Sequence, residues 1–343
     1  MATSPAQAPP EVERLLLGID VGGSYVKVGL VDRRGKLQAK VRAATPSLRT
    51  PQGVVAHALE FANAKLREFG LPVEALEAVG MAVPGVLDSQ AYRLREVVNL
   101  PGWLNEPLLE ILSETTRLQA AVVNDANAAA YAEHSLRNLQ RESLALITLG
   151  TGIGCGLVVG GDPYGGDHGC AGELGHIAVR FGPTALPCTC GSRGHLESYA
   201  GAAGVIARLR EELARVDDAS IPQSQIPPSL LEPDVSPKEI AEAAEAGCEP
   251  CRRVIEETAE FVGQAVGMLG QVIDPTVVLL GGAMTFGGPD RAMGDFFLSQ
   301  VRQTVRETTL VQVGGNLIIE FATLGNDAGL LGAAMVAEQV RQS

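Results

Sequence analysis

Two cysteines and two histidines lie close together in the chain and carry the side chains that bind transition metals. His176, Cys188, Cys190 and His195 follow the spacing H-x11-C-x-C-x4-H. Thiolate sulfur and imidazole nitrogen are ligands of tetrahedral zinc sites, and four protein ligands leave no open position for a substrate. A disulfide between Cys188 and Cys190 would be strained. The spacing therefore predicts a structural zinc site, with free thiols as the alternative.

A neighbouring amide and carboxylate, Asn124-Asp125, stand where the short buried strand expected at 120–124 meets the alanine-rich stretch that follows. A carboxylate at the end of a buried strand could accept the proton of a hydroxyl that attacks phosphorus. Asp125 could equally be the N-cap of the helix that opens there. The pair predicts either a general base or a helix cap.

The segment Asp20-Val-Gly22-Gly23-Ser24-Tyr-Val-Lys27 combines a tight glycine turn with charged and hydroxyl side chains. Glycines allow the backbone to approach a phosphate closely. Ser24 would add a hydroxyl, Lys27 a positive charge and Asp20 a ligand for Mg²⁺. The turn predicts phosphate binding, and the alternative is an ordinary hairpin whose lysine faces solvent.

Two further glycine turns follow apolar runs, the first at 148–152 and the second at 281–282. Their unobstructed backbone amides could bind a nucleotide. The first adds two hydroxyls for phosphate oxygens, and the second could let a flat adenine pack against the backbone. Strand-like residues follow the first turn, where a dinucleotide fingerprint would open a helix, and the chain contains no G-x-x-x-x-G-K-[ST]. Turns without a ligand are the alternative for both. They are Thr148-Leu-Gly150-Thr151-Gly152 and Gly281-Gly282.

The chain contains six cysteines and no export signal, so disulfides are not expected. Cys248-Glu-Pro-Cys251 has C-x-x-C spacing, but it lies in a segment of helical pattern without a thioredoxin-like context. Core or surface thiols are therefore the preferred interpretation of this pair.

The composition indicates an acidic globular protein of 343 residues, with a formal net charge of −13 and a pI near 4.9. This length suits two domains of moderate size. The charge disfavours nucleic acids and anionic membranes as partners, and no apolar run reaches the roughly 18 residues of a membrane helix. The first 14 residues indicate a flexible tail and not a signal peptide. A cytoplasmic protein is expected.

The elements that must position these residues alternate between strands and helices. Two strand–turn–strand patterns, at 15–32 and 143–161, occur in separate regions and hint at an internal duplication. Helical spacing covers 53–70 and 106–117, a buried strand is expected within 275–284, and the last helix begins near Asp327. The alternation predicts an α/β fold, and the hairpins predict sheets that mix antiparallel and parallel strands.

Six short motifs, in their order along the chain, resemble the ROK family (repressors, open reading frames, kinases), with bacterial glucokinases as the most similar branch. The resemblance runs from about Leu15 to the C-terminal helix, and the set is far more specific than any one motif. The motifs are D-x-G-G-S-x-x-K, N-D-A-N, L-G-T-G-I-G, E-L-G-H, C-x-C-G-x-x-G-x-x-E and G-N-D-A-G-L-L-G-A.

The resemblance implies the actin-like ATPase (ribonuclease H-like) fold, in which two related α/β domains flank a cleft. The implied N-terminal domain comprises residues 15–133 and 327–343, and the C-terminal domain comprises 134–326 with the zinc-binding loop. The phosphates of ATP would lie between the two glycine hairpins, and adenosine would lie near Gly281-Gly282.

The resemblance also implies roles for individual residues. Asp125 matches the catalytic base, Mg²⁺ would accompany ATP, and His176 would bind structural zinc through one nitrogen and face the sugar with the other. The family usually has cysteine where this chain has His195, so the zinc site would be His₂Cys₂; imidazole is also a good zinc ligand. The residues that match the sugar contacts are Asn99, Asn124, Glu173, His176 and Glu197.

The resemblance thus implies ATP-dependent phosphorylation of a hexose, most of all glucose on its 6-hydroxyl, by a homodimer or homotetramer. A kinase for fructose, mannose or an N-acetylhexosamine is the first alternative, and polyphosphate is a lesser candidate for the donor. A sugar-responsive repressor is the second. It is disfavoured because only 14 residues precede the first strand, too few for a helix-turn-helix, and because the chain is acidic.

Overall fold

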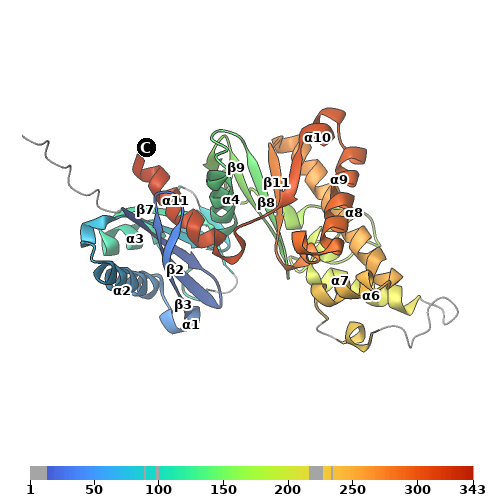
Figure 1. Cartoon of the computed structure of the whole chain (residues 1–343), viewed down its shortest axis with the longest axis horizontal. Helices are drawn as coiled ribbons and strands as arrows, with labels where there is room; N and C mark the ends of the chain where they lie inside the picture. The colour runs from blue at the N-terminus through green and yellow to red at the C-terminus, as the bar shows by residue number, and fades with distance from the viewer. Residues whose placement is uncertain (1–13, 89, 98–99, 216–226, 233–234, 343) are drawn as a thin grey trace, which may run out of the picture. The chain divides into compact units, whose positions relative to one another are not determined.

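The computed structural model describes residues 14–342 except 89, 98–99, 216–226 and 233–234 (Figure 1). The predicted N-terminal tail lies outside the described residues apart from Arg14. The chain divides into two compact units. The first unit contains the described residues as far as Ala128 and those from Gly329 onward, and the second unit is Ala129–Ala328. Within the described ranges, no helix combines the length and the apolar character needed to cross a membrane.

The first unit is built on a five-stranded sheet with the strand order β3-β2-β1-β4-β7. The predicted hairpin at 15–32 is confirmed as the antiparallel pair β1 and β2, whereas β4 and β7 run parallel to β1. The expected mixture of antiparallel and parallel strands is therefore present. The strands are β1 (Leu15–Val21), β2 (Tyr25–Asp32), β3 (Leu37–Ala44), β4 (Leu76–Val83) and β7 (Gln119–Asn124); β5 (Val86–Asp88) and β6 (Arg93–Glu96) form a separate ribbon.

The residues at the two ends of α2 explain where this helix begins and where it stops. The Thr50 side chain accepts a hydrogen bond from the Gly53 amide at the start of α2, and Pro51 occupies the first turn, where its missing N–H is not needed. Gly70 ends the helix with φ +69°, a left-handed conformation that glycine adopts without strain. The helices are α1 (Thr45–Leu48), α2 (Pro51–Phe69), α3 (Leu108–Thr116) and α11 (Ala328–Gln342).

Alternate residues of β1 face different helices. Leu15, Leu17 and Ile19 are buried in one apolar cluster with residues of α2 and α3. Gly18 points to the opposite face, where a Cβ atom added to it would lie 2.3 Å from the carbonyl oxygen of Leu330 in α11. The period-two alternation of a strand thus places α11 on one face of the sheet and α2 with α3 on the other.

A row of glycines lets the backbone of α11 approach this sheet. Gly29, Gly18 and Gly80 are paired across β2, β1 and β4. A Cβ atom on Gly80 would lie only 1.7 Å from the carbonyl oxygen of Ala333. Side chains are therefore sterically excluded along this row as long as α11 keeps its place.

We expect Gly80→Ala to destabilise the protein by about 3 kcal/mol, because the methyl group must push α11 off the sheet. Gly315→Ala is the matched control, since a Cβ atom there meets nothing within 4 Å. Chemical denaturation followed by far-UV circular dichroism measures both changes. Equal stability of the two variants would contradict this close packing.

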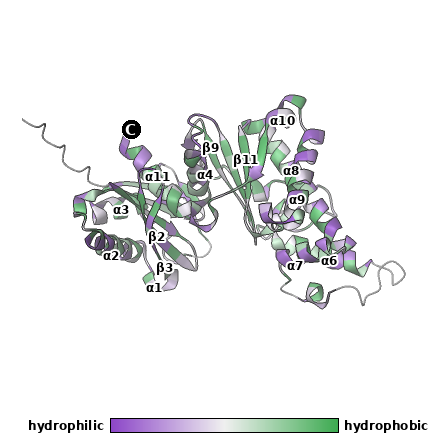
Figure 2. Ribbon diagram, in the orientation of Figure 1, coloured by the Kyte–Doolittle hydropathy of each residue, from purple (hydrophilic) through white to green (hydrophobic). Residues whose placement is uncertain are grey.

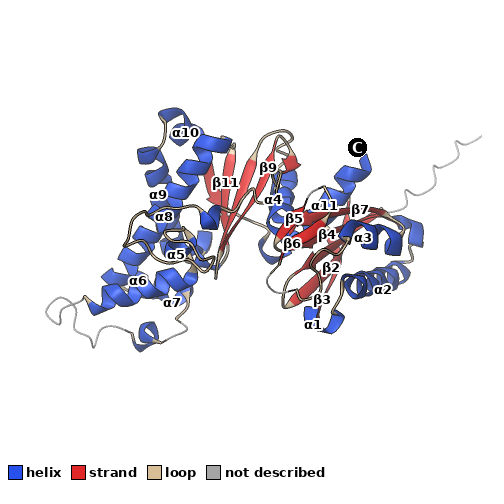
Figure 3. Ribbon diagram, turned by 180° about the vertical axis from the view of Figure 1, so that it is seen from behind, coloured by secondary structure: helices blue, strands red, loops and turns tan. Residues whose placement is uncertain are grey.

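The second unit repeats the same arrangement with a second five-stranded sheet, in the order β10-β9-β8-β11-β12. Its first three strands again form an antiparallel meander, and β11 and β12 again run parallel to the first strand, β8. The two sheets share one topology, as the two strand–turn–strand patterns suggested (Figure 3). The strands are β8 (Leu144–Leu149), β9 (Ile153–Val159), β10 (Asp162–Pro163), β11 (Val277–Gly281) and β12 (Ile318–Phe321).

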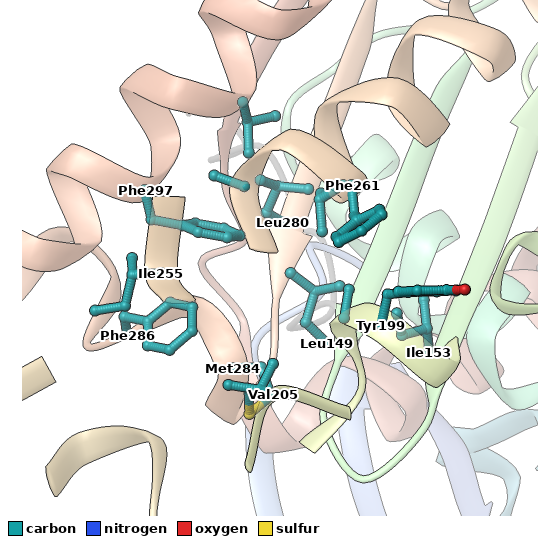
Figure 4. Packing of buried hydrophobic residues seen from close by; sticks show 14 of the residues in the cluster. Leu149, Ile153, Tyr199, Val205, Ile255, Phe261, Leu280, Met284, Phe286 and Phe297 are labelled. Atoms are coloured by element: carbon teal, nitrogen blue, oxygen red, sulfur yellow. The ribbon is translucent and has the colours of Figure 1, made fainter. Parts of the chain in front are cut away.

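The main core of the second unit lies between this sheet and a group of helices. Figure 4 shows Phe261, Leu280, Phe286 and Phe297 among its members, and other positions of the same strands contact α4 on the opposite face. Figure 2 shows both polar and apolar residues on α8, as expected for a helix with one buried face. The helices of this unit are α5 (Glu197–Ala200), α6 (Ala202–Ala214), α7 (Pro237–Glu245), α8 (Glu249–Ile273), α9 (Ala292–Thr308) and α10 (Val311–Asn316); α4 (Asp125–Leu136) begins in the first unit.

Candidate functional site

The four predicted zinc ligands come together in the second unit. The ligand atoms of His176, Cys188, Cys190 and His195 all lie within 4.8 Å of one another. A tetrahedral zinc ion with ordinary bond lengths would set its ligand atoms about 3.3 to 3.8 Å apart. The Sγ atom of Cys190 is already 3.2 Å from Nδ1 of His195, and Sγ of Cys188 is 3.8 Å from Nδ1 of His176. The geometry of the four residues fits zinc.

Backbone hydrogen bonds hold the loop that carries these ligands. The amide of Cys188 donates to Ser192 at 2.8 Å, and the amide of Gly191 donates back to Cys188 at 3.0 Å. Gly191 has φ +92°, which favours glycine in this tight turn. His195 forms an isolated β-bridge with Ala178, two residues beyond His176. This bridge brings the ligands from the two ends of the segment to one place.

The two nitrogens of His176 face different groups. Nδ1 faces the thiol of Cys188, and Nε2 lies 4.0 Å from a carboxylate oxygen of the exposed Glu173. Burial raises the pKa of the Cys188 thiol, but hydrogen bonds from Cys190, His176 and His195 outweigh that effect and lower the pKa to about 6. These hydrogen bonds therefore favour the thiolate form of Cys188, which is the form that binds metals.

Glu197 follows the last predicted ligand by two residues and reaches the second glycine turn. Its Oε2 atom accepts a hydrogen bond of 3.0 Å from the amide of Ile153. A Cβ atom on Gly152 would lie 2.6 Å from the same oxygen, so a side chain there would displace the Glu197 carboxylate from this position. The sequence did not predict this contact, because the two residues lie 44 positions apart. The carboxylate thus connects the metal-ligand loop to the β8–β9 turn.

The second and third glycine turns lie against each other within the second unit. Gly150 closes the β8–β9 turn by donating its amide to Gly152 at 3.0 Å, and the hydroxyl of Thr148 lies 3.4 Å from the carbonyl oxygen of Gly154. Gly281 is the last residue of β11, and Gly282 follows it with φ +94°. A Cβ atom on Gly282 would lie 2.2 Å from the carbonyl oxygen of Leu149. The ends of β8 and β11 therefore form one surface of small residues, which includes the exposed Thr151.

The first glycine turn belongs to the first unit and has its own charged pair. The Nζ atom of Lys27 donates to a carboxylate oxygen of Asp20 at 2.9 Å, so this lysine does not simply extend into solvent. The hydroxyl of Thr45 donates to the carbonyl of Gly22 at 2.6 Å and fixes the turn from a neighbouring segment. Gly23 and the exposed Ser24 complete the turn.

Asn124, and not Asp125, provides the main cap of α4. The Oδ1 atom of Asn124 accepts hydrogen bonds from the amides of Ala126 and Asn127, at 2.9 and 3.1 Å, and its Nδ2 donates to the carbonyl of Gly85. Asp125 is the first residue of the helix and also lies 2.8 Å from the Ala126 amide. The sequence suggested Asp125 as a possible N-cap, but Asn124 accepts most of the capping hydrogen bonds.

The sheet of the first unit places the predicted polar residues at one edge. Asp20 at the end of β1 pairs with Ala82 of β4, and the next residue, Val83, pairs with Asn124 of β7. Because these three strands are parallel, Asp20, Asn124 and Asp125 all lie at their carboxyl ends, the edge where α/β proteins commonly bind ligands. Asn99, the remaining predicted sugar contact, lies outside the described residues.

Comparison with known proteins places these features in a family. The model of the ROK family matches residues 16–340. A glucokinase from Streptomyces coelicolor is 31% identical over 336 residues, which cover 95% of this chain and 98% of the relative. The crystal structure of a ROK hexokinase from Thermus thermophilus has a TM-score of 0.74 at 31% identity, over 96% of this chain and 100% of that one.

A ROK glucokinase from Streptomyces griseus, solved with glucose and AMPPNP, gives a TM-score of 0.68 at 30% identity, over 95% of this chain and 99% of that one. Relatives with other activities are similar as well. An N-acetylmannosamine kinase from Citrobacter koseri is 30% identical, over 94% of this chain and 98% of the relative. A xylose repressor from Caldicellulosiruptor bescii is 26% identical, over 94% of this chain and 77% of the relative.

The duplicated sheet and these structural neighbours identify the actin-like ATPase fold, as the sequence motifs implied. The match of the family model covers nearly all of the described elements, from β1 to α11. The chain belongs to the ROK family.

Proposed function

We propose that this protein is an ATP-dependent sugar kinase that transfers the γ-phosphate of ATP to the 6-hydroxyl of glucose, with Asp125 as the general base. The observation that carries the proposal is the placement of Asp20, Asn124 and Asp125 together at the carboxyl ends of the parallel strands β1, β4 and β7. A carboxylate at this end of the sheet could accept the proton of a sugar hydroxyl. The kinases among the relatives support the reaction, and a protein that uses ATP as the donor would act in the cytoplasm.

The glycine turns would bind the nucleotide. The backbone amides of the β1–β2 and β8–β9 turns, the hydroxyls of Ser24 and Thr151 and the ammonium of Lys27 would contact phosphate oxygens. Gly281 and Gly282 would leave room for adenosine beside the end of β8. Bound Mg²⁺ would offset negative charge on the phosphates, with Asp20 as its protein ligand.

The sugar would be bound by polar side chains around the metal-ligand loop. Glu173 and Glu197 would accept hydrogen bonds from sugar hydroxyls. The Nε2 atom of His176 faces Glu173, whereas its Nδ1 atom faces the thiol of Cys188. A structural zinc ion would fix His176 and, through His195, the start of α5 where Glu197 lies. Zinc would thereby orient the sugar site without contacting the reacting atoms.

Glucose is the proposed substrate because glucokinases are among the similar relatives over nearly the whole chain. An N-acetylhexosamine is the second candidate, because an N-acetylmannosamine kinase is similar at 30% identity. A hydroxyl that is lost or inverted would leave a buried polar group unpaired, at about 1–3 kcal/mol, so we expect at least about tenfold discrimination between epimers.

A coupled assay of ADP release tests the substrate. We expect kcat/KM with ATP to be highest for glucose among glucose, mannose, fructose, N-acetylglucosamine and N-acetylmannosamine, with a sugar-free reaction as the blank. A higher value for another sugar would overturn the choice of glucose and leave the kinase proposal standing. Absence of sugar-dependent ADP release with every sugar would overturn the kinase proposal itself.

A further inference from the structure

The C-x-x-C pair occupies the junction between α7 and α8 in the second unit (Figure 1). Cys248 is the N-cap of α8 and is extended, with φ −71° and ψ 98°. Cys251 lies in the first turn of the helix, and Pro250 between them occupies a position where a missing N–H breaks no helical hydrogen bond. The pair is thus placed at the start of a 25-residue helix, in agreement with the helical pattern of this segment.

The two thiols differ in access but are neighbours. Cys251 is fully buried in the main core of the second unit, whereas Cys248 is only partly buried. Residues three apart at a helix start have Cβ atoms about 5–6 Å apart, so their side chains meet. A disulfide would require these Cβ atoms to approach to about 3.5–4.5 Å, a shift that the extended N-cap residue Cys248 can supply more easily than a residue within the helix. A hydrogen bond from the Cys251 side chain lowers the pKa of the Cys248 thiol to about 6. The partial positive charge of the helix N-terminus also favours a thiolate at Cys248.

We propose that Cys248 and Cys251 are a redox-active dithiol that exchanges with small disulfides of the glutathione class. The Cys248 thiolate attacks one sulfur of the small disulfide, and one thiolate leaves and takes up a proton. The hydrogen bond to Cys248 and burial raise the pKa of the Cys251 thiol. Its proton therefore leaves only as Cys251 attacks the Cys248 sulfur of the mixed disulfide, and it passes to the departing thiolate, which is released as the second small thiol. Two protein thiols are oxidised to one disulfide, and one small disulfide is reduced to two thiols.

The other described cysteines lack this combination. Burial raises the pKa of Cys155 to about 12, so its thiol is a poor nucleophile. Cys188 and Cys190 belong to the metal-ligand cluster. Cys170 is exposed, and its Sγ atom lies 3.5 Å from the carbonyl oxygen of His168. Cys155 and Cys170 therefore serve as the buried and the exposed internal controls.

The test uses the purified full-length protein in buffers with increasing ratios of oxidised to reduced glutathione. After quenching with N-ethylmaleimide, trypsin releases residues 239–252, a single peptide that contains both thiols. We expect this peptide to lose two mass units and both alkylation sites in most of the chains at the oxidising end, and to recover them on reduction. A peptide that stays doubly alkylated while Cys170 becomes glutathionylated would overturn the proposal.

Two variants test the order of the steps. Cys251→Ser is expected to accumulate a mixed disulfide with glutathione at Cys248, because the second step is blocked. Cys248→Ser is expected to leave Cys251 unmodified, since its buried thiol cannot reach the small disulfide. Modification of Cys251 in a folded Cys248→Ser protein would refute this order. The wild-type peptide result stands by itself if either variant fails to fold, and it does not depend on kinase activity.

Discussion

Replacing Asp125 with asparagine is expected to lower kcat about 10²- to 10⁴-fold and to leave the fold intact. The substitution keeps the size of the side chain but removes the carboxylate that would accept the proton of the attacking hydroxyl. The start of α4 should survive, because the hydrogen bonds of Asn124 to Ala126 and Asn127 are unchanged. Steady-state kinetics with saturating glucose and ATP provide the measurement.

Asp162→Asn is the matched control for this prediction, because it removes an exposed carboxylate on β10 with the same change of atoms. It should leave kcat within about twofold of the unmodified protein. Thermal unfolding of both variants would show whether the fold is kept. A folded Asp125→Asn protein with near-normal turnover would rule out the role of general base.

The metal-ligand cluster is expected to hold about one zinc ion per chain in protein purified without chelator. Replacing Cys188 and Cys190 together with serine should bring the zinc content close to zero, because only two imidazole ligands remain. The loop 173–197 should then lose its order, since zinc binding and loop folding are coupled. Elemental analysis and limited proteolysis would detect the two effects.

Cys170→Ser is the control for the zinc prediction, because it removes an exposed thiol that is not among the four clustered residues. It should retain full zinc content and the same resistance to protease. Zinc that persists at one ion per chain in the double variant would disprove the ligand assignment. Unmodified protein without zinc would disprove the site altogether.

Local patterns were sufficient to predict several elements of the fold. The apolar alternation around Gly22-Gly23 indicated the β1–β2 hairpin, and Gly70 indicated the end of α2, because both signals act through the conformation of the residue itself. The capping box of Ser236 and Glu239 at the start of α7 is a signal of the same local kind, since both of its hydrogen bonds join residues three positions apart.

Features that depend on distant residues could not be predicted from local patterns; that residues 327–343 join the first unit was implied only by the family resemblance. Nothing near Gly18 or Gly80 in the sequence indicates that α11, about 250 to 310 residues later, covers them. The contact of Glu197 with the Ile153 amide likewise joins residues far apart in the chain, 44 positions from each other. At Asn124-Asp125, sequence reasoning weighed only Asp125 as the cap, because propensities rank Asn and Asp alike at that position. The choice between them depends on the backbone path at the end of β7.

The position of α11 sets the order in which a newly made chain can mature on the ribosome. The second unit is continuous in sequence, so all its residues are synthesised before the helix Ala328–Gln342. The sheet of the first unit, although translated earliest, keeps its glycine-lined face uncovered until this last helix has left the exit tunnel. Maturation therefore reverses the usual progression from N-terminus to C-terminus. A chain that lacks α11 would carry all the elements of the second unit beside a first sheet with one open face, and such exposed surface is what chaperones bind.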